Sequence, residues 1–144
     1  MKRAKTITAA LFAALILPSF AVADSFAISP TKLLVSRAER SATLTVKSGG
    51  PDQMQGQVRV MKWTRSGGKD HLAPTRDVIA SPPVLRLARN QETTIRLVRV
   101  KKAPVRQQRE CYRVLIDQLP GDSQRNSAVK FTIRHSVPLC FTRG

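Results

Sequence analysis

A strict alternation of apolar residues near the end of the chain restricts the fold more than any other feature. In SAVKFTIRHSVPLCF, residues 127–141, every odd position from Val129 to Phe141 is apolar except His135. A period of two residues puts these side chains on one face of a half-buried β-strand. The run covers 13 residues, whereas strands of about 5 or 6 residues are usual. It is longer than the sheet of a small domain requires.

The rest of the sequence is a series of short β-rich runs separated by turn-forming residues, without a helical period. Seven such runs predict an all-β protein, an immunoglobulin-like, seven-stranded antiparallel β-sandwich, and a small barrel is the alternative. We expect Pro82 and Pro83 to mark a sheet edge or a bend, and residues 64–76 and 99–109 to form the longest turns. The expected strands are residues 26–36, 41–48, 56–63, 77–88, 93–100, 111–119 and 127–141.

Two of these runs change face part-way along. In the first run, Ile28 and Leu33 fall on opposite parities around Pro30, so we expect the strand to cross from one sheet to the other. In the third run, the apolar residues move from even to odd positions between Val60 and Met61. This change predicts a β-bulge or a change of sheet.

The first 23 residues have the pattern of a secretory signal peptide. A basic start, MKRAK, precedes an uncharged apolar run, and Ala21-Val22-Ala23 is the small-x-small pattern that signal peptidase cleaves after. Cleavage would leave residues 24–144, that is 144 − 23 = 121 residues, enough for one domain. A single membrane anchor is the alternative, but the apolar run is short and contains Pro18. We therefore expect an exported one-domain protein without a membrane span after cleavage.

The chain is strongly basic. Its formal charge is +16, and loss of the three basic residues of the signal segment would leave 16 − 3 = +13. Such a charge attracts anionic lipids, polysaccharides or acidic protein surfaces. Nucleic acid is not expected as a partner, because the chain is exported and has no aromatic stacking platform.

The two cysteines fall on the outward faces of the last two runs. Cys111 lies beside Arg113 on the outward face of its run, and Cys140 lies at an even, outward position of the last run. These runs are joined by a short turn, so the two thiols would meet across an antiparallel ladder. We predict a disulfide worth about 3 to 4 kcal/mol, with two free thiols as the alternative. Two sulfurs without nearby ligands do not predict a metal site.

The sequence predicts neither an enzyme nor a cofactor. His71 and His135 are the only histidines, and neither has a serine or cysteine nucleophile at a recognisable elbow. The nine acidic residues form no paired-carboxylate motif. A phosphate-binding loop is also missing from the sequence, so ATP use is not suggested.

Four segments together resemble the N-terminal domain of the periplasmic chaperones of the chaperone/usher pathway for pili and fimbriae. They are FAISPTKLLVS, SPPVLRLARNQETTIRLV with its double proline, ECYRVLIDQLP and VKFTIRHSVPLCF. Their order and spacing, together with a signal peptide, make the resemblance specific, and it covers nearly all of residues 25–141. It implies a periplasmic protein whose partners are pilus or fimbrial subunits and an outer-membrane usher.

The resemblance also implies a role for the long last strand. In this family the strand completes the chaperone's own sheet and is donated to a pilus subunit, an immunoglobulin-like fold that lacks its final strand. Val129, Phe131 and Ile133 match the donor residues, and Val137 lies on the same face. The alternative is that these residues fill only the core of this domain.

The same resemblance implies a basic anchor for the carboxylate of the subunit. Lys32 stands where the family has an arginine, which keeps the charge but loses the bidentate geometry. Pro138 stands where the family has a lysine, so Arg134 or Arg143 would have to replace it. Some members of the family carry a cross-strand disulfide between the last two strands, as we predict here.

A second departure from the family concerns its length. Family members have two immunoglobulin-like domains, whereas this chain stops three residues after Phe141. We therefore expect residues 24–144 to form the N-terminal domain alone, either as a truncated product or with the missing half supplied by another polypeptide. A lone domain of this kind would expose an apolar edge, which predicts self-association through the last strand.

A different class of function remains open as the alternative. The chain would then be a basic, secreted, immunoglobulin-like module that binds anionic surface polymers. Lys101, Lys102, Arg106 and Arg109, in the longer basic turn, would carry the binding.

Overall fold

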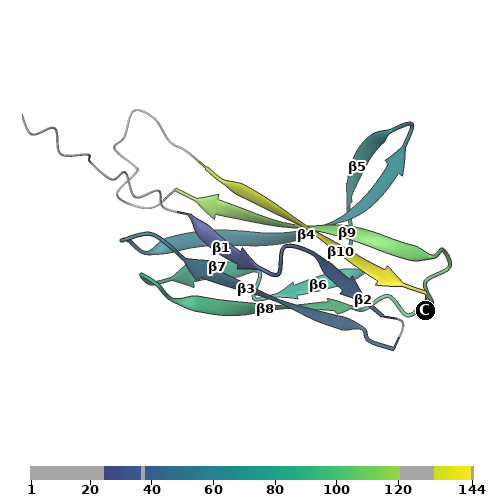
Figure 1. Cartoon of the computed structure of the whole chain (residues 1–144), viewed down its shortest axis with the longest axis horizontal. Coiled ribbons are helices and arrows are strands. Elements are labelled where there is room, and N and C mark those ends of the chain that lie inside the picture. Colours follow the sequence, from purple (N-terminus) through teal and green to yellow (C-terminus); the bar gives the residue numbers. More distant parts are fainter. Residues whose placement is uncertain (1–24, 37, 121–131, 144) are drawn as a thin grey trace, which may run out of the picture.

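The computed structural model describes residues 25–36, 38–120 and 132–143, and these form two packed β-sheets (Figure 1). The described residues form no helix, and therefore they contain no helix that is long and apolar enough to cross a membrane. The predicted all-β sandwich is confirmed. The strands of the described residues are β1 (Phe26–Ser29), β2 (Leu33–Val35), β3 (Ser41–Ser48), β4 (Met54–Ser66), β5 (Lys69–Pro74), β6 (Val78–Ser81), β7 (Val84–Leu87), β8 (Glu92–Arg99), β9 (Arg109–Leu119) and β10 (Arg134–Thr142).

The strands divide into a four-stranded and a six-stranded sheet. The first has the order β1-β3-β8-β6, and the second has the order β2-β10-β9-β4-β5, with β7 also paired to β4. The seven predicted runs correspond to ten strands because two runs are split and β5 is additional. The sandwich is also not purely antiparallel, since β10 and β2 run parallel to each other.

Both split runs cross between the sheets. β1 pairs with β3 in the four-stranded sheet, and β2 pairs with β10 in the six-stranded sheet, with Pro30 between them. Likewise β6 pairs with β8, whereas β7 pairs with β4, and Pro82 and Pro83 lie at the crossing. Proline has no backbone N–H to donate to a ladder, so it ends a strand where the chain must change sheets. The predictions for the first run and for the double proline are confirmed.

The change of face predicted within β4 is wrong. β4 pairs with β9 without interruption from Gln55, opposite Leu119, to Trp63, opposite Cys111. The strand therefore has no bulge in this pairing. Trp63 lies on the outer face of the six-stranded sheet, where the guanidinium of Arg113 stacks 4.0 Å from its ring centre. An apolar residue here covers the outside of the sheet and does not turn into the core.

Residues 64–76 are a hairpin and not the predicted turn. β4 continues to Ser66 and pairs with β5 across Gly67 and Gly68. Both glycines have positive φ angles, 57° and 76°, which a two-residue hairpin turn requires and glycine adopts without strain. The hairpin projects from the body of the sandwich (Figure 1). The other predicted long turn is confirmed, since residues 100–108 connect β8 and β9 without a strand.

The core lies between the two sheets and takes side chains from both. Apolar residues at alternate positions face inward, as the period of two predicts. The largest fully buried side chains are Tyr112, Leu44, Leu85, Leu87, Ile95, Leu97, Ile116, Leu139, Val46 and Val114.

The predicted disulfide is present. Cys111 of β9 and Cys140 of β10 are direct cross-strand partners, and their Cα atoms are 4.1 Å apart. The bond lies on the outer face of the six-stranded sheet, beside Trp63, which is also paired with Cys111. It holds the last strand of the domain against its neighbour.

Candidate functional site

Among the described strands, β10 has two partners along one part of its length and one partner along the rest. β9 pairs with β10 from Arg134 to Thr142. The backbone N–H of Gln118 also donates a 2.9 Å hydrogen bond to the carbonyl of Ile133, so this ladder begins one residue earlier. β2 covers the other edge only from Leu139 to Phe141. We call residues 133–138 the open half of the strand and residues 139–142 the closed half.

The inward side chains of β10 become more exposed toward the open half. Leu139 and Phe141 are buried, and Val137 is 4% exposed. His135 is partly exposed, and Ile133 reaches 38%. Ile133 and Val137 thus lie on one face of the strand, at its open edge. Val129 and Phe131, the other two residues matched to the donor strand, lie outside the described residues.

A cleft of about 980 Å³ lies over the outer face of the six-stranded sheet. Its lining includes the disulfide, Trp63, Pro138 and residues of the loop between β8 and β9. Seven lysine and arginine residues line it, against one acidic residue, Glu110. The cleft therefore combines an apolar floor with a strongly positive rim, which suits an anionic group carried on an apolar segment. The basic lining residues are Lys32, Lys62, Arg65, Lys101, Arg106, Arg109 and Arg113.

The structure brings Lys32 and Pro138 to the same cleft and adds Arg113 to them. Arg113 of β9 is the cross-strand partner of Pro138, and all three residues line the cleft. Sequence reasoning did not single out Arg113. The signal was available, because pairing Cys111 with Cys140 fixes a register in which Arg113 lies opposite Pro138.

The two arginines considered as replacements for the missing basic residue lie elsewhere. Arg134, at the start of β10, forms an ion pair with Asp117, which also binds Arg59 at 2.6 Å. Arg143 lines a separate cavity of about 500 Å³, beside Arg40. Among the described residues, neither Arg134 nor Arg143 is part of the lining of the larger cleft.

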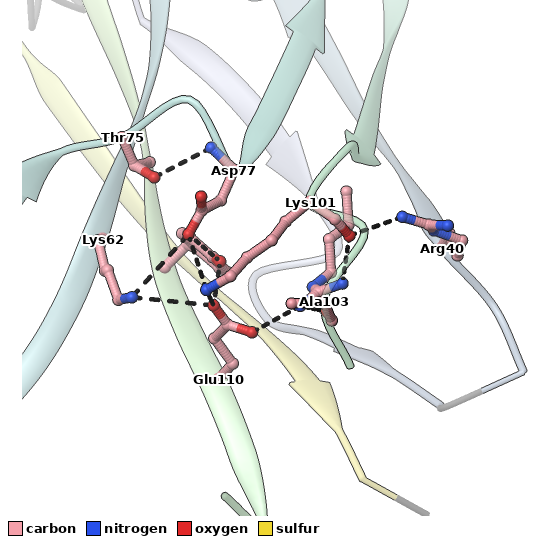
Figure 2. A network of polar contacts seen from close by, with 9 residues as sticks. Arg40, Lys62, Thr75, Asp77, Lys101, Ala103 and Glu110 are labelled. Atoms are coloured by element: carbon pink, nitrogen blue, oxygen red, sulfur yellow. Dashed lines mark hydrogen bonds and ion pairs between the residues drawn. The ribbon is translucent and has the colours of Figure 1, made fainter. Parts of the chain in front are cut away.

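Figure 2 shows a network of buried and half-buried charges. Three of its members also line the cleft, namely Lys62, Lys101 and Glu110. Glu110 accepts hydrogen bonds from Arg99 at 2.9 Å, from the Tyr112 hydroxyl at 2.8 Å and from Lys101 at 3.0 Å. Asp77 lies at 3.2 Å from the same hydroxyl and at 3.5 Å from the Lys101 ammonium. Lys101, which the sequence suggests as a ligand-binding residue, is therefore held by two carboxylates of its own chain.

The network shifts the titration of its members. Burial opposes ionisation of Glu110, but the hydrogen bonds from Arg99, Tyr112 and Lys101 outweigh it and lower the pKa of Glu110 to about 2. Burial raises the pKa of the Tyr112 hydroxyl, and the adjacent Glu110 carboxylate raises it further. The pKa of Lys101 is raised, chiefly by its hydrogen bond to Glu110. Near neutral pH, Glu110 therefore stays ionised, Lys101 stays protonated and Tyr112 stays neutral.

The network also shapes the loop between β8 and β9. Arg99 donates hydrogen bonds of 2.7 Å to the carbonyls of Lys101 and Ala103, and Arg40 donates one of 2.7 Å to the carbonyl of Lys101. Arg99 also lies 6.0 Å from the ring centre of Phe141 in β10. The loop that forms one wall of the cleft is thereby tied to the closed half of β10. In the described part of the chain, no group of three or more His, Cys, Asp or Glu side chains is placed to hold a metal ion.

The family follows from a match to residues 25–142. These residues match the family model of the pili and flagellar-assembly chaperone, PapD N-terminal domain. This chain belongs to that family. The PapD N-terminal domain family consists of assembly chaperones, which are not enzymes, and this confirms the expectation drawn from the sequence. No functionally curated protein matches the chain significantly in sequence.

Solved chaperone structures share the fold. The chain is similar to a chain of the CsuC–CsuE chaperone–tip adhesion subunit pre-assembly complex, from the archaic chaperone-usher Csu pili of Acinetobacter baumannii. The identity is 28%, the TM-score is 0.70, and the match covers 82% of this chain and 51% of that chain.

Two further structures have lower identities and carry information on the fold alone. A chain of the Salmonella enterica complex of SafA pilin with the SafB chaperone is 21% identical, with a TM-score of 0.67, and the match covers 82% of this chain and 54% of that one. The E. coli chaperone DraB is 19% identical, with a TM-score of 0.64 and coverages of 83% and 55%. The chain spans about half the length of the structures it matches. The immunoglobulin-like sandwich of the PapD N-terminal domain is thus its fold.

Proposed function

We propose that this chain is a periplasmic chaperone that binds pilus or fimbrial subunits by donating strand β10 and delivers them to an outer-membrane usher. The observation that carries the proposal is the open half of β10, whose second edge has no strand partner among the described residues. Removal of residues 1–23 as a signal peptide and residence in the periplasm belong to the same proposal. The family and the similarity to a chaperone–subunit complex support it.

The open half has the chemistry that strand donation needs. Backbone N–H and C=O groups along an unpaired edge are available to an added strand, which supplies binding energy without regard to sequence. The inward apolar side chains add specificity, and Ile133 is the most exposed of those in the described strand region. Val129 and Phe131 continue the same alternation in the sequence. A subunit with an open core groove would bury these side chains.

We assign the carboxylate anchor of the subunit to Lys32 and Arg113. Both line the positively charged cleft, and Arg113 lies directly opposite the proline that replaces the family's lysine. Stacking on Trp63 fixes the guanidinium plane, which favours a directed, charge-assisted hydrogen bond to a carboxylate. Asp70, at 4.0 Å, offsets part of this charge. Loss of either cation would weaken binding without affecting strand pairing.

The test is co-purification from the periplasm. The mature chain is expressed with pilus subunits of the same organism, and the wild type is compared with Phe131→Asn/Ile133→Asn. The proposal expects a stoichiometric complex that the double variant loses. Thr132→Asn/Ser136→Asn is the matched control, because these positions have the other parity and are exposed. Equal capture by the wild type and Phe131→Asn/Ile133→Asn would rule out strand donation.

The alternative, a module that binds anionic polymers, rests on the exposed side chains of Lys102, Arg106 and Arg109. It predicts that reversing these charges abolishes binding to an anionic polysaccharide such as heparin, whereas Phe131→Asn/Ile133→Asn leaves it intact. Strand donation predicts the opposite pattern for the subunit. Self-association through the open half would appear as a dimer in sedimentation, and the same double variant would make it monomeric.

A further inference from the structure

His135 is the one polar residue in the inward row of β10. It lies between Ile133 and Val137 on the open half, and its cross-strand partner Ile116 is fully buried. The alternation along this strand would be satisfied by a valine or an isoleucine at the same position. The presence of an imidazole there is not explained by the packing of the domain.

The imidazole of His135 has a buried nitrogen without a partner. Its Nε2 atom is shielded from solvent and has no hydrogen-bond partner in the described residues. In either neutral tautomer this atom is a donor or an acceptor, and leaving such a group unpaired in a buried place is unfavourable. The nearest ion pair on the same strands, Arg134 with Asp117, belongs to residues of the opposite parity and faces outward. Among the described residues, Nε2 of His135 therefore has no hydrogen-bond partner on the neighbouring strands.

We propose that His135 determines which subunits the open half of β10 accepts. The inference rests on the proposed function, because it requires a subunit strand along this edge. An accepted subunit would present a carboxylate, an amide or a hydroxyl at this point of its groove, and the partly exposed ring of His135 would turn about its side-chain bonds to bring Nε2 to that group. A groove that is apolar there would leave the imidazole nitrogen buried and unpaired, so that subunit would bind less tightly. Ile133 and Val137 supply apolar contact on either side, and His135 supplies selectivity.

The experiment measures the dissociation constant of the complex between the mature chain and the pilus subunit that it captures in the co-purification. His135→Val removes the hydrogen-bonding group at similar width, and His135→Gln keeps one. We expect His135→Val to weaken binding at least tenfold and His135→Gln to weaken it by less than threefold. Ser136→Val, one position away and exposed on the other face, is the matched control and should leave the constant unchanged. Equal or tighter binding by His135→Val would overturn the inference.

A second measurement tests selectivity and not affinity alone. Photo-crosslinking from position 135 identifies the groove residue of the subunit that faces it, and that residue is replaced by valine. The altered subunit should prefer the His135→Val chaperone over the wild type at least fivefold, which reverses the original order. An unchanged order would show that His135 is only a packing residue.

The outcomes separate this inference from the proposed function. If Phe131→Asn/Ile133→Asn still captures the subunit, strand donation fails, and the role of His135 fails with it. If that double variant loses capture while His135→Val binds as the wild type does, strand donation stands and only the inference about His135 is wrong. Thermal unfolding of each variant, followed by the fluorescence of Trp63, shows that the compared chains are folded.

Discussion

The closed and open halves of β10 belong to one continuous strand but have different surroundings. In the closed half, Leu139 is fully buried, has strand partners on both sides and lies next to a disulfide. In the open half, Ile133 is 38% exposed, and β9 is its one strand partner among the described residues. The open half therefore leaves an edge to which a further strand can be added.

This difference separates two tasks within one strand. The closed half fixes the register and position of β10, and the open half is left available at a defined place. A rigid scaffold beside a binding segment lowers the ordering cost of association, because the segment is already extended when a partner arrives. We expect stability to depend on the closed half and binding to depend on the open half.

The largest effect is expected from the disulfide. Replacing both cysteines, Cys111→Ala/Cys140→Ala, should lower the free energy of unfolding by about 3.5 kcal/mol, because the unfolded chain loses a closed loop. Urea unfolding followed by the fluorescence of Trp63 measures this change. An unchanged unfolding free energy would mean that the closed half is held by packing alone.

Leu139→Ala should have the next largest effect. Leu139 is fully buried between the sheets, and removal of such a side chain costs about 3 kcal/mol through lost burial and a residual cavity. The same urea titration measures it, and subunit capture by the folded fraction should be unchanged. If capture is lost from a well-folded variant, the closed half also takes part in binding.

Acid should weaken the anchoring of the closed half. Glu110 is the cross-strand partner of Phe141, and its pKa is lowered from 4.5 to about 2 by the network around it. A folded-state pKa below the unfolded value stabilises the domain above about pH 4.5, and this contribution is lost as the pH falls toward 2. We expect a loss of about 2 kcal/mol, allowing for partial solvation.

The control for the acid prediction is Glu110→Gln, which should unfold with a shallower dependence on pH over the same range. Asp117 has a lowered pKa of the same sign, because its ion pairs with Arg134 and Arg59 outweigh the opposing effect of burial. Only the difference between the wild type and Glu110→Gln therefore reports on the closed half. Identical pH profiles would contradict the role that we give to Glu110.

The smallest effect on stability is expected at Ile133. Ile133→Ala should lower the free energy of unfolding by less than about 1 kcal/mol, since a partly exposed residue buries little additional surface. The same variant should weaken subunit capture far more than it weakens the fold. Calorimetry of the free chain gives the change in stability, and calorimetry of complex formation gives the change in subunit binding. A large loss of stability in the free chain would contradict the assignment of stability to the closed half.

The elements that follow from short-range backbone rules could be predicted from the sequence. A period of two residues identifies the inward face of β10, and proline accounts for both crossings between the sheets, at Pro30 and at Pro82-Pro83. The disulfide follows from parity, because two outward cysteines on neighbouring antiparallel strands meet when the register allows it.

The remaining features depend on contacts that no single segment contains. All residues of β5 are exposed, so its sequence needs no alternation of apolar residues. The one sequence feature that indicates its hairpin is Gly67-Gly68. Trp63 disrupts the pattern of its strand because it covers the outer face beneath Arg113. The partners of Glu110 come from β4, β8, β9 and the loop between β8 and β9, so the ion pairs of Lys101 could not be inferred from its place in a basic turn. The expectations for Val129 and Phe131 stay predictions.

The parallel pairing of β2 with β10 has a consequence for the order in which the domain folds. β2 lies near the start of the sandwich, and its strand partner in the described structure lies at the other end. Contacts so distant along the chain form late. In a chain that enters a compartment from its N-terminus, the six-stranded sheet would therefore stay incomplete until β10 arrives. For that interval the chaperone would itself be a sandwich awaiting its final strand, the same defect that we propose it repairs in others.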